Sequence, residues 1–303
     1  MKKTKAVITT AIIFSMLMSI SLLAGPEEKI EKTFEKKENI RFKLVLGDLE
    51  LKKSSDNRIH VHLVYSYGSD VTYEPKLEER GNRLYLEEKT RGKNVKGYSK
   101  WTVSIPDDIE IDFKSATGDL VVSGLDLEID GNTGTGDIDI SHAKGEYDVN
   151  TGTGNVDVYD SEGEFDLNSG TGKVRVENCK GNFDVNSGTG DVEGKGLFIE
   201  FEGNFSSGTG DAEVEFPDGG DFELSLSSGT DDAVLNMSGK PIQGYFEFRC
   251  HARKGRIISP VNFDIEEEYE ANDQTYLKKS FTKGNEAVKI YIKTGTGTAR
   301  LNK

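Results

Sequence analysis

The sequence predicts an all-β solenoid, a chain wound into stacked coils of about 18–21 residues each. One observation is a phrase that recurs at a fixed interval, first as Asn132-Thr-Gly-Thr-Gly-Asp-Ile-Asp-Ile140. Its second glycine stands at Gly136, Gly154, Gly172 and Gly190, each 18 residues after the last. The other observation is that apolar and polar residues alternate on both sides of the phrase, as in a strand with one buried face. A strict repeat of this length is typical of a solenoid, because each coil buries its apolar side only against its neighbours.

Each repeat predicts two short strands. Apolar residues stand seven and five positions before the second glycine, and again two and four positions after it. The pairs before it are Tyr147/Val149, Phe165/Leu167 and Phe183/Val185, and those after it are Ile138/Ile140, Val156/Val158 and Val174/Val176. The same parity places the Thr and Ser positions of the phrase on the buried side. The phase changes at the second glycine, where we expect a bend or bulge, since glycine adopts positive φ at no Cβ cost.

The asparagine that opens each phrase predicts a row of stacked side chains. Coils that stack as neighbouring strands lie about 4.8 Å apart, a spacing at which amide side chains can form ladders. The expected row is Asn132, Asn150, Asn168 and Asn186, continued by Ser206 and Ser227.

Residues 1–25 predict a secretory signal peptide. Lys2, Lys3 and Lys5 form a charged start, an apolar run follows over residues 6–23, and Ala24 is a small residue suited to cleavage. The alternative is an uncleaved membrane anchor, because the apolar run reaches the ~18 residues that span a bilayer. Serines and threonines inside the run favour cleavage. No cysteine lies near the expected cleavage site, so the sequence does not predict a lipoprotein.

The charge balance limits the classes of partner. The chain has a formal net charge of −15. Cleavage after residue 24 would remove three lysines and no acid, leaving 35 basic residues against 53 acidic ones. Nucleic acids and anionic membranes need a cationic face, so we expect neither as a partner. The composition fits an exported, self-repelling protein.

The part before the regular array predicts a stem and a cap. Residues 26–38 are highly charged, and we expect them to form a mobile stem. Residues 39–51 repeat the coil pattern around Gly47 without the Thr-Gly pair. Further alternating strands are expected at Arg58–Tyr67, Arg83–Glu88 and Lys100–Ile105. We interpret residues 39–105 as an atypical β start that caps the first open edge of the solenoid.

Residues 106–303 predict the solenoid itself. Gly118 already stands 18 residues before Gly136, and the spacing loosens to 20 at Gly210 and 21 at Asp231. Apolar pairs in the coil pattern return near residues 248–257 and 290–301. The acidic and polar segment between them, residues 259–284, is expected to be a long loop.

Rows of acidic residues raise the question of calcium. The candidate ligands lie one and three positions after the second glycine: Asp137, Asp139, Asp157, Asp191, Glu193 and Asp211. Calcium-binding β-rolls use a different phrase, G-G-x-G-x-D, twice per coil. Lys173 and Arg175 also interrupt both rows, where a bound cation would be repelled. A solvated acidic strip is therefore favoured over a calcium site, and no metal or cofactor is predicted.

Catalysis is the second alternative, because parallel β-helices that cleave acidic polysaccharides use carboxylates on a strand face. An acid–base pair needs two carboxylates in different environments, whereas these form uniform rows. The histidines His60, His62, His142 and His251 are scattered along the chain. No catalytic residue is predicted.

The two cysteines are expected to be free thiols. Cys250 falls at an inward position, and Cys179 lies in a turn at the position of Ala143 and Ser161 in earlier coils. We expect three coils between them, or about 14 Å at strand spacing, which exceeds the ~7 Å Cα limit for a disulfide.

The Thr/Ser-Gly-Thr-Gly-Asp-Val phrases, the Ile105-Pro106 lead-in and the closing Ile290–Gly297 segment resemble the putative-adhesin family of exported bacterial and archaeal β-solenoids. The resemblance covers residues 39–303. It implies a right-handed parallel β-helix at or near the cell envelope. The family supplies no catalytic residues to transfer, and its adhesin label rests on fold-level analogy.

Together these observations favour a non-enzymatic exported solenoid that presents an acidic face to an envelope, protein or glycan partner. The alternatives are a carbohydrate-active β-helix enzyme, which would need a cleft lined by paired carboxylates and aromatics, and a calcium-dependent adhesin.

Overall fold

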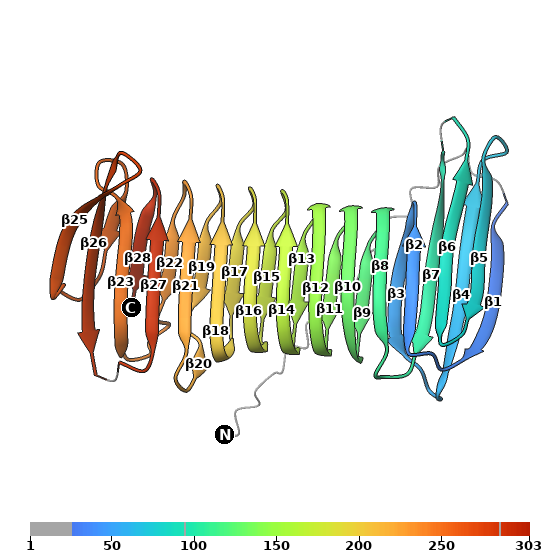
Figure 1. Ribbon diagram of the computed structural model, residues 1–303, viewed down its shortest axis with the longest axis horizontal. Helices are drawn as coiled ribbons and strands as arrows, with labels where there is room; N and C mark the ends of the chain where they lie inside the picture. The colour runs from blue at the N-terminus through green and yellow to red at the C-terminus, as the bar shows by residue number, and fades with distance from the viewer. Residues whose placement is uncertain (1–25, 94, 285) are drawn as a thin grey trace, which may run out of the picture.

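Two long β-sheets face each other along the length of the molecule (Figure 1). The computed structural model describes residues 26–303 except residues 94 and 285, and within them the regular elements are all strands. Most strands pair in parallel with the equivalent strand of the next coil. In the central array each coil contributes one long strand to one sheet and one four-residue strand to the other.

The 13-stranded sheet is called sheet A. Its strands in spatial order are β1 (Glu28–Glu35), β4 (Arg58–Tyr67), β7 (Gly97–Ile105), β3 (Gly47–Lys53), β9 (Leu120–Ser123), β11 (Ile138–Ser141), β13 (Val156–Tyr159), β15 (Val174–Glu177), β17 (Val192–Lys195), β19 (Ala212–Glu215), β22 (Ala233–Asn236), β28 (Thr298–Asn302) and β24 (Arg256–Ile258).

The 15-stranded sheet is called sheet B. Its strands in spatial order are β25 (Ile265–Ala271), β26 (Gln274–Lys283), β23 (Gly244–His251), β27 (Lys289–Thr294), β21 (Glu223–Ser228), β18 (Phe198–Ser207), β16 (Lys180–Ser187), β14 (Glu162–Ser169), β12 (Lys144–Thr153), β10 (Asp126–Thr135), β8 (Glu110–Thr117), β2 (Asn39–Leu44), β6 (Arg83–Arg91) and β5 (Thr72–Arg80), with β20 (Asp218–Gly219) paired to β18.

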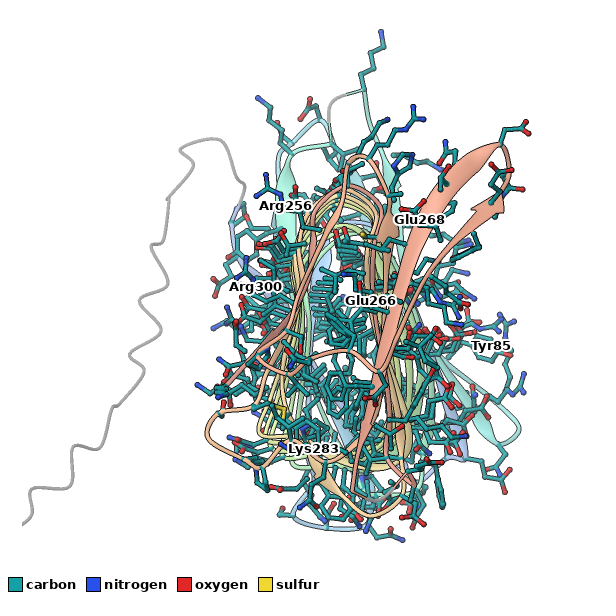
Figure 2. All side chains as sticks on the ribbon, turned by 90° about the vertical axis from the view of Figure 1, so that its left-hand side faces the viewer. Tyr85, Arg256, Glu266, Glu268, Lys283 and Arg300 are labelled. Carbon is teal, nitrogen blue, oxygen red and sulfur yellow. The ribbon has the colours of Figure 1, made fainter. Side chains whose placement is uncertain are left out.

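The core lies between the two sheets and follows the predicted inward positions. Tyr147, Phe165 and Phe183 stack with ring centroids 5.4 and 5.2 Å apart, because their strands pair in register. Val149 and Leu167 are fully buried beside them. Figure 2, which looks along the stack of coils, shows side chains filling the space between the sheets. The period-2 prediction is confirmed for these residues.

The Thr and Ser positions of the phrase divide into two kinds. The first is buried, and its hydroxyl donates a hydrogen bond to the carbonyl of the second glycine in the preceding coil, as from Ser169 to Gly154 at 2.7 Å. The second, such as Thr135 or Thr153, is exposed, so the predicted parity holds only for the first.

The second glycine is required by close packing and not by positive φ, which corrects our expectation. A Cβ on Gly154 would lie 2.0 Å from the carbonyl oxygen of Gly136, and one on Gly172 would lie 1.7 Å from that of Gly154. Both distances are far below contact, so neighbouring coils approach this closely only where the residue has no side chain.

The asparagine row is in register as predicted, with Ser206 and Ser227 continuing it. The predicted hydrogen-bonded ladder between the asparagine amides does not form, however. Each amide donates instead to the aspartate two residues earlier in its own strand, as from Asn168 Nδ2 to Asp166 Oδ1 at 2.6 Å. The row therefore fixes the orientation of the neighbouring carboxylates.

At both ends the coils do not stack in chain order. The coil of β2 and β3 lies against that of β8 and β9, while the strands between them in sequence, β4 to β7, lie outside it. At the other end, β27 and β28 insert between the coil of β21 and β22 and that of β23 and β24. The last coil along the chain therefore fills a gap that earlier strands leave open.

The charged stem, residues 26–38, is a correction to the sequence prediction. Glu28–Glu35 forms the edge strand β1, antiparallel to β4, rather than a mobile segment. Phe34 is buried, Ile30 packs against the core, and Lys32 lies over the Phe34 ring at 4.7 Å. Backbone pairing with β4 and these two apolar residues hold the strand in place, while the aliphatic part of Lys32 covers apolar surface.

The loop expected at residues 259–284 is also corrected. Most of it forms the antiparallel hairpin β25/β26. Two of its glutamates face lysines on the partner strand: Glu266 lies 2.6 Å from Lys279, and Glu267 lies 2.7 Å from Lys278. Opposite charges directly across a strand pair stabilise this hairpin, although its polar composition is typical of a loop.

The outermost strands carry features that oppose edge-to-edge pairing. They are β1 and β5 at one end and β24 and β25 at the other. β5 contains Pro75, β24 has three residues, and β25 carries Glu266, Glu267 and Glu268 in succession. Proline and charge on an edge strand block the addition of another chain, so the ends of this solenoid do not favour end-to-end growth.

Candidate functional site

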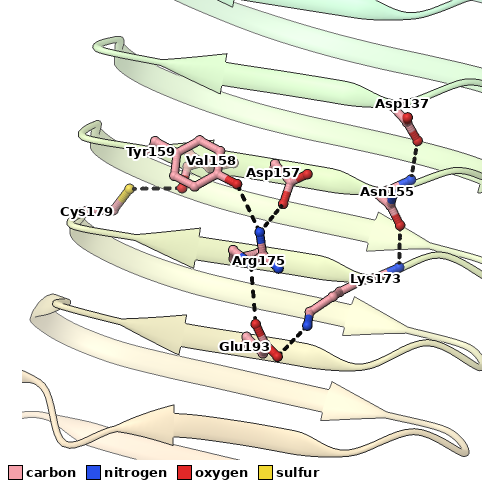
Figure 3. Close-up of polar contacts among 9 residues, drawn as sticks. All are labelled: Asp137, Asn155, Asp157, Val158, Tyr159, Lys173, Arg175, Cys179 and Glu193. Atoms are coloured by element: carbon pink, nitrogen blue, oxygen red, sulfur yellow. Dashed lines mark hydrogen bonds and ion pairs between the residues drawn. The ribbon is translucent and has the colours of Figure 1, made fainter. Parts of the chain in front are cut away.

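Two outer surfaces carry rows of acidic side chains, one on each sheet. On sheet A, the residue directly after the second glycine bonds the backbone of the next coil. Asp137 Oδ1 accepts the Asn155 N–H at 2.7 Å, and Asn155 Oδ1 accepts the Lys173 N–H at 2.9 Å (Figure 3). The same contact joins Asp191 to Asp211 at 3.1 Å and Asp211 to Asp232 at 2.9 Å. These carboxylates therefore hold coil to coil.

The next row on sheet A alternates between acidic and basic groups. Arg175 lies 3.8 Å from Asp157 and 3.3 Å from Glu193, and its Nη1 donates to the Tyr159 hydroxyl at 3.3 Å (Figure 3). Lys173 also pairs with Glu193. Although burial alone would raise the pKa of Glu193, its hydrogen bonds to Lys173 and Arg175 lower it. This end of the row is internally neutralised.

Asp139 stands at the uncompensated end of that row. Burial, followed by repulsion from Asp157, Asp137 and Asp119, raises the pKa of Asp139 to about 6. Burial also raises the pKa of Asp157, although Arg175 opposes the shift. Asp139 is therefore the strip carboxylate with the strongest tendency to hold a proton near neutral pH.

The six calcium candidates of the sequence are not equivalent in the structure. Asp137, Asp191 and Asp211 accept backbone N–H groups, and Glu193 is bound to Lys173 and Arg175. Asp157 lies 3.8 Å from Arg175, which leaves Asp139 as the candidate without an ion pair or a backbone N–H donor among the described residues. Across the described ranges 26–93, 95–284 and 286–303, no group of three or more His, Cys, Asp or Glu residues is arranged to hold a metal ion.

The outer face of sheet B carries a second and denser acidic surface, which sequence reasoning did not single out. In-register pairing of β8, β10, β12, β14 and β16 aligns two rows of carboxylates. We call this surface the acidic face of sheet B; it comprises Glu110, Glu128, Glu146 and Glu164 in one row and Asp112, Asp130, Asp148, Asp166 and Asp184 in the other. Burial, with repulsion from Asp148 and Asp184, raises the pKa of Asp166.

A bulge in β18 closes one end of this acidic face. The register shifts between Gly181 and Phe183, and the extra residues of β18 place Phe201 at the surface with 72% of its area exposed. Asn182 holds the bulge by accepting the backbone N–H groups of Phe201 and Glu202 at 3.1 and 3.2 Å. A shallow groove of about 420 Å³ runs from Phe201 along the carboxylates of β12, β14 and β16.

The comparisons with known proteins decide the family. The sequence profile of the family described as Toastrack DUF4097 matches residues 37–239, more than half of the chain. The chain belongs to the Toastrack DUF4097 family. The suspected membership of an adhesin-like family of unknown function is thereby supported. A comparison with curated proteins gives no match.

Solved structures similar to this Toastrack chain include several described as adhesins. A putative cell adhesion protein from Clostridium sporogenes is 16% identical, covers 91% of this chain and 99% of its own, and has a TM-score of 0.28. A putative adhesin from Bacteroides fragilis is 15% identical, covers 90% and 97%, and has a TM-score of 0.40. A putative lipid binding protein from Parabacteroides distasonis is 12% identical, covers 92% and 97%, and has a TM-score of 0.26. At these identities and TM-scores the likeness says nothing about the ligand of this chain.

The histidines of the Toastrack chain do not converge on one site. His60 bonds Thr33 at 3.1 Å and Asp56 at 2.8 Å, while His62 lies 3.8 Å from Glu31. His142 lies at a distant turn, 3.7 Å from Asp160. Each ring is occupied by a local surface contact.

Both cysteines are buried and free. The expected separation of three coils between them is too small, because β27 inserts between β21 and β23. Cys179 precedes β16, and Cys250 lies in β23, four strand spacings away in sheet B, or about 19 Å at 4.8 Å each. The larger separation strengthens the argument against a disulfide.

A buried carboxylate in the N-terminal end of the Toastrack chain was also missed. Glu88 is 4% exposed, and its two oxygens accept hydrogen bonds from Tyr73, Ser99 and Trp101 and from the backbone of residues 45 and 46. The period-2 pattern of β6 places Glu88 on the buried side with Leu84 and Leu86, which is the signal that could have found it. It joins β6, β7 and the first turn.

Proposed function

We propose that this protein is a non-enzymatic, exported β-solenoid that acts as a binding scaffold at the cell envelope or surface, in an adhesin-like role. The observation that carries the proposal is the acidic face of sheet B. Its carboxylates repeat in register over five strands, and an exposed aromatic side chain stands at one end. A rigid face with a repeating charge is suited to binding an extended partner of opposite charge.

The charges on this face are largely available for a partner. Glu128, Glu146 and Glu164 form no ion pair with other described residues. Asp148 and Asp166 bond only the asparagine two residues later, which holds the carboxylate and leaves its charge in place. Repulsion along the rows lowers the stability of the free protein and is relieved when a cation binds, so the face gains free energy from a cationic partner.

The uniformity of the face argues against the enzyme alternative. A glycosidase needs one carboxyl group that is protonated and one that is ionised, which requires two different environments. Here Glu146 and Asp148 in one coil are repeated in register as Glu164 and Asp166 in the next, so like carboxylates recur along each row. We therefore propose a binding role, and we assign no catalytic residue.

Export is part of the proposal, and it rests on the sequence. The expected signal peptide, residues 1–25, lies outside the described residues. Within residues 26–303, with positions 94 and 285 set aside, no helix is long and apolar enough to cross a membrane. Right-handed winding of the coils is likewise proposed, because connections between parallel strands of one sheet are right-handed in about 98% of cases.

The binding role is tested with a labelled decalysine peptide as the cationic probe. Glu146→Gln/Glu164→Gln removes two charges from the acidic face of sheet B. Glu213→Gln/Glu215→Gln removes two from sheet A and serves as the matched control. We expect the first variant to bind decalysine roughly two- to thirtyfold more weakly, since exposed charge pairs contribute about 0.2–1 kcal/mol each. Equal affinities for the two variants would refute the assignment of binding to sheet B.

A further inference from the structure

A second surface feature lies at the C-terminal end and has the opposite charge. The hairpin β25/β26 extends sheet B at this end. Figure 2, viewed along the coils, shows that the hairpin projects away from the stack. Between the hairpin tip, β23 and β27 lies a pocket of about 200 Å³. Its walls include Arg249, Lys293, Tyr269, Tyr276 and Asn272.

A row of cations crosses this part of sheet B. Strand register places Lys293 of β27 opposite Arg249 of β23, and Arg249 opposite Lys278 of β26. Like charges directly opposite one another destabilise a sheet, so such a row needs compensation. Glu247, nearly fully buried, supplies part of it, at 2.5 Å from Arg249 and 3.7 Å from Lys278, and Glu267 supplies more, at 2.7 Å from Lys278.

On the side of the row that faces the pocket, the positive charges are not fully neutralised by glutamates. The Nε and Nη2 of Arg249 both bond Glu247 Oε1, and its Nη1 forms no hydrogen bond with the described residues. Lys293 is exposed and forms no ion pair with the described residues. Two positive groups thus line one pocket in a chain whose net charge is −15. An anionic group would be repelled over most of this protein and attracted here.

The aromatic wall indicates more than a simple anion site. Tyr269 and Tyr276 stack with centroids 5.6 Å apart and planes at 22°, and His251 meets Tyr276 edge-on at 5.9 Å. Both tyrosines line the pocket together with the two cations. Asn272 lies at the hairpin tip with its side chain exposed, and an amide both donates to and accepts from hydroxyl groups.

We propose that this pocket binds one acidic sugar residue, a uronic acid, at the end or within an anionic glycan. Arg249 and Lys293 hold its carboxylate, because the guanidinium fork and the ammonium charge both suit that group. The sugar ring packs against Tyr276, and Asn272 bonds a ring hydroxyl. The pocket is smaller than the roughly 300–1,000 Å³ that drug-sized ligands occupy, which suits a single sugar unit.

The uronic-acid site is independent of the acidic face of sheet B. Its residues come from Arg249 onward, beyond the matched family range of 37–239, and thus belong to a part of the chain that the family profile does not cover. It attracts anions, whereas the acidic face attracts cations, so either site can fail its test while the other passes.

The test is an NMR titration of the full chain with sodium glucuronate, with glucose and inorganic phosphate as comparison probes. We expect glucuronate to bind with a Kd in about the millimolar range, tighter than glucose or phosphate. Lys293→Gln should weaken glucuronate binding at least about fivefold, because it removes one of two charges on the carboxylate. Lys289→Gln, on the same face of the same strand and outside the pocket, should leave it unchanged.

Tyr276→Ala separates the sugar from the charge. It should weaken glucuronate binding and leave the phosphate signal as it was, with thermal melting of each variant checking the fold. Absence of glucuronate binding to the parent chain would overturn the proposal. Equal binding of glucose, equal binding of phosphate, or equal loss in Lys289→Gln and Lys293→Gln would overturn it as well.

Discussion

Replacing Asp139 by asparagine should stabilise the protein at pH 7. Its carboxyl group has an unfolded pKa of 3.8 and a folded pKa of about 6, because it is partly buried beside Asp157, Asp137 and Asp119. A raised carboxyl pKa means that the folded state binds more protons between these two values, so stability falls as pH rises through that range. By linkage the penalty at pH 7 is at most about 3 kcal/mol, and roughly half of that after screening by solvent.

The assay is thermal unfolding of the parent chain and Asp139→Asn at pH 7 and at pH 4. For a domain of this size, 1 kcal/mol corresponds to about 2–4 °C, so a gain of about 3–6 °C is expected at pH 7. At pH 4 the gain should shrink to nearly nothing, because the folded parent is then protonated at this position. A variant that melts at or below the parent at pH 7, or that keeps its gain at pH 4, would refute the reasoning.

Three further changes test the coil contacts. Gly154→Ala should lower the melting temperature strongly, since its Cβ would lie 2.0 Å from the neighbouring carbonyl oxygen; an unchanged melting curve would contradict the packing. Asp137→Ala should cost about 0.5–1.5 kcal/mol by removing the exposed hydrogen bond to the Asn155 N–H, as calorimetry can measure. Arg175→Glu should destabilise the chain by removing two ion pairs and lengthening a like-charge row, and added salt should reduce the loss.

The repeating part of the fold could be predicted because a single residue pattern determines it. Alternation fixes which side chains point inward, so Tyr147, Phe165 and Phe183 could be assigned to the core from the sequence. The order of coils at the ends could not be predicted. The insertion of β27 beside β23 depends on pairing between distant segments, and no local pattern encodes it.

The candidate sites were harder to predict than the fold. The carboxylates of sheet B each look like ordinary outward residues, and only strand register aligns them into one face. A high content of charged residues also made one strand look like a linker. Glu28–Glu35 forms β1, and its Phe34 side chain is buried in the core. The row of Lys293, Arg249 and Lys278 arises from three segments that are separated in sequence, so the uronic-acid site is visible only in the fold.

The central claim is that the acidic face of sheet B is the binding surface. It is tested most directly by chemical labelling of carboxyl groups in the free chain and in its decalysine complex, with mass spectrometry locating the label. The account predicts that decalysine protects Glu146, Asp148, Glu164 and Asp166 from labelling and leaves Glu213 labelled as before. Equal protection of both sheets, or protection of sheet A alone, would contradict it.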